Sequence, residues 1–214
     1  MAVPSDIWLY RITHIDNLEH ILREGCLTVH SKKRSKNYRQ IGDKSMIDYR
    51  KDLDAPNPPG GKFSEFIPFY LGPRSPMLYQ IATGWEDIEQ VDQREIIYII
   101  SSFEMVKEHD LEFFFTDGHA RSRTSKPFIN EGDFKKLDWE AIYARRWNNE
   151  ANDLRRKDRK QSEFLVKDHL PVSCIVRIGV YSVSVKRKVL DLLESIGLEI
   201  DVNVDPRELY YDHL

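Results

Sequence analysis

Short runs of β-branched and aromatic residues recur along the whole chain, and polar or helix-like segments separate them. The clearest run is Glu95–Ile100 (EIIYII), which is apolar enough to be buried on both faces of a sheet. Runs of this length are typical of strands rather than helices. The strand candidates are 7–12, 66–71, 95–100, 112–115, 162–166, 174–181 and 198–204. The chain is therefore expected to fold around a sheet.

Amphipathic segments stand between these runs. Residues 184–196 repeat apolar side chains at helical spacing, and residues 15–24 do the same before Gly25. Further helices are expected to begin at Pro76 and to span 138–146, and Ser101 and Glu104 have the spacing of a capping box. No internal repeat or linker divides the chain. The pattern predicts one α+β domain over residues 1–214.

Pro68 interrupts the strand candidate 66–71. Proline has no N–H to give to a neighbouring strand, so it is normally confined to edge strands and bulges. The sequence therefore predicts an edge strand or a bulge at this point.

Charge is unevenly distributed. The formal net charge is −3, yet residues 31–51 carry an excess of six positive charges and residues 144–160 an excess of four. Two such stretches would attract a polyanion if they met in space, and would otherwise be two solvated loops.

Several classes of protein lack support. The chain has neither GxGxxG nor GxxxxGK[ST], so a Rossmann or P-loop nucleotide site is not indicated. Two distant cysteines and seven histidines without ligand spacing give no support for a disulfide framework or a zinc site, and we expect no metal. There is no secretion signal and no apolar run long enough to span a membrane, so the cytoplasm is the expected location.

Four groups of residues carry a family resemblance. They are Leu9–Leu18 (LYRITHIDNL), Pro58–Gly61 with the later IPFY and PRSPML motifs of residues 67–78, Phe115–His119 (FTDGH), and Gln161–Val166 (QSEFLV). In this order and spacing they resemble the DarT family of bacterial DNA ADP-ribosyltransferase toxins. The resemblance extends from about residue 7 to the C-terminus.

The resemblance implies an ADP-ribosyltransferase-like fold, with a split β-sheet core, flanking helices and long substrate loops. It implies transfer of ADP-ribose from NAD to a base in single-stranded DNA, with thymine expected and guanine as the alternative, and release of nicotinamide. It also implies a macrodomain antitoxin of the DarG type that removes the mark. The alternatives are an enzyme of the same fold acting on RNA or protein, and a nucleic-acid-binding module without catalysis.

Glu163 matches the catalytic glutamate of the family. As nicotinamide leaves, C1′ of its ribose gains oxocarbenium character, and a fixed carboxylate stabilises that cation. Arg50 matches the family arginine that engages the substrate base. Because its pKa exceeds about 12, arginine is a poor general base, so we expect Arg50 to orient the base or stabilise charge.

The remaining site predictions follow the same resemblance. Residues expected to contact NAD are Arg11, Thr13, Asn17, Leu18, Tyr70 and Arg50. Residues expected to contact the acceptor are His119, Arg74, Arg145, Arg146, Trp147, Arg155 and Arg156, since cations and rings are the usual means of holding single strands. The alternatives are that Leu18 and Tyr70 are core residues, that His119 is a turn residue, and that the arginines are solvated cations.

Overall fold

The structure of the chain is a computed structural model that describes residues 2–29, 37–43 and 52–211. Eight strands form one sheet in the order β10-β9-β4-β1-β3-β7-β5-β6, and β2 pairs with β8 in a second, two-stranded sheet. Neighbours are antiparallel except β9 and β10, which are parallel. The strands are β1 (Trp8–His14), β2 (Cys26–Thr28), β3 (Phe66–Tyr70), β4 (Ile96–Ser102), β5 (Phe113–Thr116), β6 (Pro127–Phe128), β7 (Glu163–Lys167), β8 (His169–Pro171), β9 (Arg177–Val180) and β10 (Asp201–Val204).

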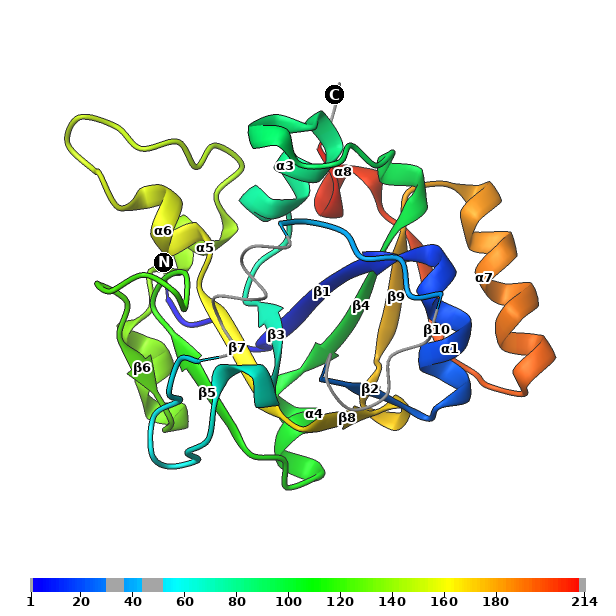
Figure 1. Ribbon diagram of the computed structural model, residues 1–214, viewed down its shortest axis with the longest axis horizontal. Helices are drawn as coiled ribbons and strands as arrows, with labels where there is room; N and C mark the ends of the chain where they lie inside the picture. The colour runs from blue at the N-terminus through cyan, green and yellow to red at the C-terminus, as the bar shows by residue number, and fades with distance from the viewer. Residues whose placement is uncertain (1, 30–36, 44–51, 212–214) are drawn as a thin grey trace.

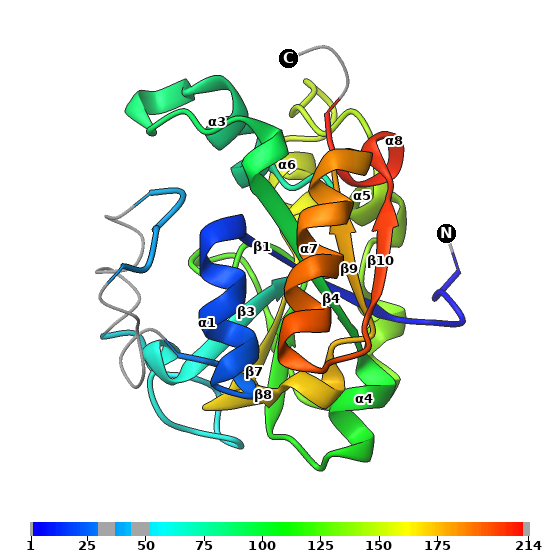
Figure 2. The same ribbon diagram turned by 90° about the vertical axis from the view of Figure 1, so that its right-hand side faces the viewer.

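Helices cover both faces of this sheet (Figure 1). They are α1 (Leu18–Arg23), α3 (Pro76–Thr83), α4 (Phe103–Glu108), α5 (Trp139–Tyr143), α6 (Arg156–Lys160), α7 (Val183–Ile196) and α8 (Pro206–Leu209). Short 3-10 segments occupy Ile15–Asn17, Phe63–Glu65, Trp85–Asp87, Gln93–Glu95, Glu131–Lys136 and Val172–Cys174. Figure 2 shows α1 and α7 side by side in front of the strands, and Figure 1 shows α3 and α8 together above them.

Successive side chains of the central strands point to opposite faces of the sheet, so the core lies in two parts, one on each face. Leu9, Ile97 and Ile99 pack with apolar side chains of α1 and α7, whereas Tyr10, Ile12 and Tyr98 pack with those of α3 and α8. All seven residues of β4 are buried, as its continuous apolar run predicts. This arrangement confirms the predicted α+β class with flanking helices.

The prediction of an edge strand or bulge at Pro68 is wrong, because β3 lies inside the sheet between β1 and β7. Leu71 donates its N–H to Ser162 O of the β7 side, so by alternation the backbone of Pro68 points towards β1. There the two strands pair only at Tyr10 and Tyr70 and then separate. The missing N–H therefore falls where no ladder bond forms, and the sheet is split along this β1–β3 seam.

Local capping differs from the prediction in one place. Ser102, not Ser101, caps α4, because its side chain accepts the N–H of Met105. Ser75 caps α3 in the same way by accepting from Leu78, and Pro76 takes the first helical position as expected.

Candidate active site

Glu163 is the first residue of β7, and its register brings two tyrosines onto the same face. Tyr70 of β3 lies opposite Glu163, and Tyr10 of β1 lies opposite Tyr70. Directly paired residues of antiparallel strands project to one side of a sheet, so the three side chains form a row across the β1–β3 seam. Glu163 is only 2% exposed. A carboxylate in such a place is a fixed negative charge with little competing water.

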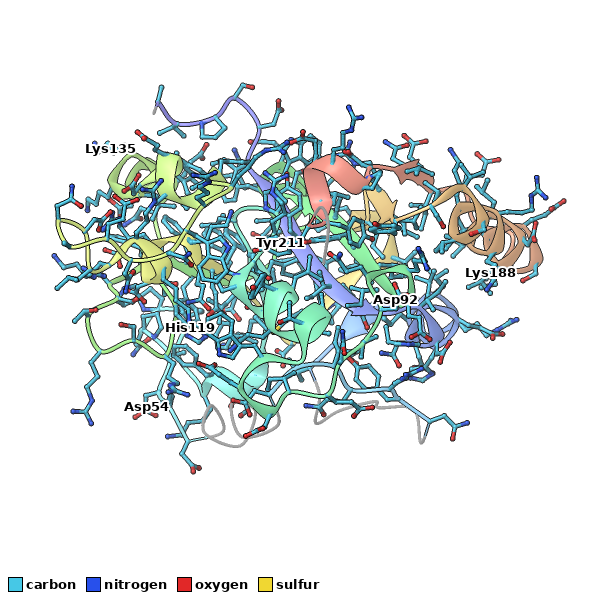
Figure 3. All side chains as sticks on the ribbon, turned by 90° about the horizontal axis from the view of Figure 1, so that it is seen from above. Asp54, Asp92, His119, Lys135, Lys188 and Tyr211 are labelled. Atoms are coloured by element: carbon cyan, nitrogen blue, oxygen red, sulfur yellow. The ribbon has the colours of Figure 1, made fainter. Side chains whose placement is uncertain are left out.

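The carboxylate of Glu163 faces the segment that follows β5. The backbone N–H of Ala120 donates to Glu163 Oε1 at 3.0 Å, and His119 Nδ1 lies 3.6 Å from the same oxygen. The N–H of Glu163 itself donates to Thr116 Oγ1, whose hydroxyl donates to Gly118 O. These contacts fix the carboxylate against residues 116–120, on the part of the molecule far from Lys188 and α7 (Figure 3).

Asp158 of α6 holds this segment in place. One carboxylate oxygen accepts the N–H of His119 at 3.2 Å, and the other accepts from Arg155 Nη2 at 2.9 Å. A side chain at Gly118 would force its neighbours to move, because an added Cβ would lie 2.5 Å from Ser125 Oγ and 2.7 Å from Asp158 Oδ2. The tight turn TDGH thus sets the position of the Ala120 N–H at Glu163, a role that sequence reasoning did not assign to Asp158.

The ring of His119 has a defined orientation. Its Nδ1 accepts the N–H of Arg121 at 3.1 Å, so in the neutral ring Nε2 carries the proton. The nitrogen nearest the Glu163 carboxylate is Nδ1, so the Nε2 proton is left for another acceptor. The predicted role of His119 as an acceptor-binding residue stays a prediction.

Arg11 reaches across the β1–β3 seam. Its Nη1 donates to Pro68 O at 2.9 Å. The side chain therefore bridges the two strands at the point where they separate, next to the Tyr10–Tyr70 pair. Its predicted contact with NAD stays a prediction, but its location beside the split agrees with a ligand held there.

Thr13 lies near the C-terminal end of β1, Asn17 ends the 3-10 segment that follows, and Leu18 begins α1. All three residues are buried. The Asn17 amide donates to Thr13 Oγ1 and Arg39 O and accepts the N–H of Arg39, each at 3.0 Å or less. These bonds hold residues 37–43 against the start of α1. Leu18 is fully buried among core residues, so its side chain belongs to the core and only its backbone is available to a ligand.

Arg50 lies outside the described residues, together with all other lysines and arginines of the stretch 31–51 except Arg39. Arg39 Nη1 lies 3.7 Å from Asp16 and 3.6 Å from Glu95. The role of Arg50 and the position of this stretch relative to Glu163 remain predictions.

The cations of the second stretch differ widely in exposure. Arg145 and Arg146 are exposed, and Arg145 pairs with Glu208 at 2.8 Å. Arg155 pairs with Asp158 beside the His119 turn, and Arg156 pairs with Glu150. Of these cations, Arg155 is the one joined through Asp158 to the turn that contacts Glu163.

Two predicted acceptor-binding residues are buried, which argues against the surface roles expected for them. Trp147 donates its indole N–H to Tyr211 Oη at 2.8 Å, and its ring packs against Tyr79. Little of that ring is left for a base to stack on. Arg74 is 6% exposed and donates to two carbonyls of α8, those of Arg207 and Glu208. Both side chains anchor the C-terminal segment, which Figure 3 shows at Tyr211, between α3 and α8.

Lys160 is buried, although the sequence places it among the cations of the surface stretch. It is 1% exposed, and its Nζ donates to Pro73 O at 2.9 Å and to Ile142 O at 2.6 Å. Burial, aided by the nearby Arg74 charge, lowers the pKa of Lys160 to about 7. Through these two bonds Lys160, three residues before Glu163, ties α6 to the segment that contains Pro73 and to α5.

Within the described residues, no group of three or more His, Cys, Asp or Glu side chains could hold a metal ion. Across the same residues, every helix is too short or too polar to span a bilayer.

Comparison with known proteins gives one consistent result. The family model described as "ssDNA thymidine ADP-ribosyltransferase, DarT" matches residues 10–211. A DNA ADP-ribosyl transferase of Thermus sp. (strain 2.9) is 39% identical over 191 residues, which is 89% of either chain. A DNA ADP-ribosyl transferase–DNA ADP-ribosyl glycohydrolase fusion protein of Thermosipho africanus is 32% identical over 116 residues, covering 53% of this chain and 27% of the fusion.

Two solved structures are closely similar. The Thermus sp. 2.9 DarT in complex with ADP-ribosylated single-stranded DNA superposes with a TM-score of 0.91 at 35% identity, covering 98% of this chain and 99% of the other. The same protein in complex with NAD+ superposes with a TM-score of 0.85 at 34% identity, covering 98% and 100%. At this similarity the split sheet and the position of β7 belong to a shared fold.

Proposed function

The chain belongs to the DarT family of single-stranded DNA thymidine ADP-ribosyltransferases, and from this premise we propose that it transfers ADP-ribose from NAD to thymidine in single-stranded DNA. Nicotinamide is the second product, and NAD is a consumed co-substrate. The observation that carries the proposal is the buried carboxylate of Glu163 on β7, held by the Ala120 N–H one strand away from the β1–β3 seam.

Glu163 acts on the ribose that carries nicotinamide. The bond from C1′ to the nicotinamide nitrogen breaks, and its electron pair leaves with nicotinamide. The cation that develops at C1′ is stabilised by the carboxylate, which also accepts a hydrogen bond from the ribose 2′-hydroxyl. A nitrogen of thymine then bonds to C1′, and its proton passes to water or to a neighbouring base.

The other residues bind and orient the two substrates. Tyr70, next to Glu163 in the row, offers its ring to the pyridinium of NAD, and Arg11 contributes a cation at the seam. Arg50 orients the thymine, while His119 donates from Nε2 to the acceptor. The exposed or partly exposed arginines hold strand phosphates; they are Arg145, Arg146, Arg155 and Arg156.

The test uses NAD labelled in its adenylate phosphate with four acceptors: single-stranded DNA with thymidine, the same strand without thymidine, duplex DNA, and RNA. We expect label only on the thymidine-containing single strand. Glu163→Gln keeps the shape and removes the charge, so transfer should fall at least about 100-fold. Glu112→Gln, a surface carboxylate paired with Lys167, is the matched control and should keep full transfer.

Label on RNA or on protein would replace the DNA assignment with another acceptor. Binding of single strands without any transfer would indicate a nucleic-acid-binding module. Full transfer by Glu163→Gln would remove Glu163 from the mechanism.

We further propose that the modification is toxic in the cytoplasm, where NAD and single-stranded DNA occur together, and that a macrodomain antitoxin removes it. The fusion relative supports this pairing, since its name joins the transferase to a DNA ADP-ribosyl glycohydrolase. Expression of the chain should stop bacterial growth, and co-expression of a DarG-type macrodomain should restore it. Growth arrest by Glu163→Gln would contradict the proposal.

A further inference from the structure

A cavity of about 310 Å³ lies between α8, the end of α5 and the sheet. Its lining includes three arginines, Arg74, Arg145 and Arg177, and two carboxylates, Asp205 and Glu208. We call it the arginine cavity. Its volume is at the lower end of the range of small-ligand sites, which suits one nucleotide.

The charges around the arginine cavity are only partly compensated. Glu208 pairs with Arg145 at 2.8 Å and with Arg74 at 3.7 Å. Arg177 instead lies over the ring of Trp8, at 5.3 Å from its centroid, and has no ion pair within the described part of the chain. Three guanidinium groups against two carboxylates leave one positive charge, which matches the single negative charge of a phosphodiester.

Two donors at this cavity lack acceptors. The Nε atoms of Arg74 and Arg177 are buried and have no hydrogen-bond partner among the described residues. A buried donor without an acceptor costs free energy, and native structures contain few of them. Arg74 is also kept there in a left-handed backbone conformation (φ 51°) by Tyr211, which donates to its carbonyl at 2.6 Å. Both Nε atoms are closed to solvent, so an anionic ligand in the cavity would reach these guanidinium groups only at their other nitrogens.

The arginine cavity shares Tyr10 with the row that contains Glu163. Tyr10 lines the cavity and is the second strand partner from Glu163, through Tyr70. On the other side of Tyr10, the register continues through Ile100 to Arg177. Strands lie about 4.8 Å apart, so the cavity extends from about 10 to about 20 Å from Glu163 along the sheet.

We propose that the arginine cavity binds one nucleotide of the acceptor DNA strand, at a phosphodiester that flanks the modified thymidine. Arg177 and Arg145 contact the phosphate. The inference rests on the proposed function, because it assumes that the strand enters at Glu163. With a phosphate about every 3.4 Å along a stacked strand, the bound linkage lies within about six of the thymidine.

The test replaces one phosphodiester at a time with an uncharged methylphosphonate, at six linkages on either side of a single thymidine. Transfer by the wild-type enzyme should fall about 10-fold at one or two of these linkages. Arg177→Gln should transfer about 10-fold more slowly to the unmodified strand. A methylphosphonate at those one or two linkages should cause no further loss in this variant. Arg187→Gln removes the same charge from the exposed face of α7 and should behave like wild type. Arg145→Gln, at a 57% exposed side chain, repeats the test if Arg177→Gln does not fold.

If the wild-type enzyme transfers equally well whichever linkage is uncharged, the proposal is overturned. It is also overturned if both arginine variants lose transfer at the same linkages, and to the same extent, as the wild-type enzyme. Equal transfer at every linkage, combined with inhibition by millimolar inorganic phosphate that Arg177→Gln abolishes, would assign the cavity to a free anion instead. If the wild-type enzyme labels no strand at all, the proposed function has failed.

Discussion

Lys160 should make the stability of this protein rise with pH over a range where most globular proteins change little. Its ammonium is buried against two carbonyls, and burial lowers its pKa from the ordinary 10.5 to about 7. Each pKa unit corresponds to about 1.4 kcal/mol, so the folded state carries a cost of about 5 kcal/mol for the charged form.

The sign follows from proton binding. Below pH 7 the folded and unfolded chains both hold the proton, and stability does not depend on this group. Between about pH 7 and 10 the unfolded chain keeps the proton and the folded chain loses it, so the free energy of unfolding increases with pH. Between pH 7 and 9 the increase should be about 2 kcal/mol, which for a chain of this size raises Tm by about 5 °C.

Urea unfolding at pH 7, 8 and 9 measures this slope. Lys160→Met cannot titrate and should lack the increase, whereas Lys188→Met, on the exposed side of α7, should keep it. Subtracting the free energy of unfolding of one variant from that of the other removes the contribution of all other groups that titrate over the same pH range. If the free energy of unfolding changes with pH in the same way for wild type and Lys160→Met, Lys160 keeps an ordinary pKa and the argument is refuted.

Two further changes test the site. In Gly118→Ala the new Cβ would lie 2.5 Å from Ser125 Oγ and 2.7 Å from Asp158 Oδ2. Moving Asp158 should loosen the His119 turn and displace the Ala120 N–H from Glu163, so kcat should fall about 10- to 100-fold at unchanged KM for NAD; unchanged steady-state kinetics would contradict this. Trp147→Phe removes the bond to Tyr211 and should cost about 1 kcal/mol of stability in urea titrations. The KM for DNA should stay the same in that variant, and a clear rise would restore the stacking role.

The regular elements could be predicted from the sequence because their signals are local. The helix expected at 184–196 is α7 (Val183–Ile196), and the strand expected at 95–100 is β4 (Ile96–Ser102). Both have an unbroken period of apolar residues, and burying that face is enough to fix the element. Pro68 misled the prediction because its effect depends on the direction of its missing N–H, which only the strand order reveals.

The site was predictable only in part, for a related reason. Family resemblance identified Glu163, but nothing in the sequence indicates which cations of 144–160 turn inward. Lys160 and Arg159 are neighbours, yet one is buried against two carbonyls and the other pairs with Asp138 and Asp153. The contribution of Asp158 was also invisible, because it acts on backbone groups 39 residues away.

The absent N–H of Pro68 has a consequence for how the substrate gap is maintained. With any other residue at this position, a donor would face β1, and the two strands could join by ordinary sheet hydrogen bonds. Proline removes one donor that such pairing would use, and Arg11 already occupies the carbonyl of Pro68, so pairing beyond Tyr10 and Tyr70 is disfavoured at this position.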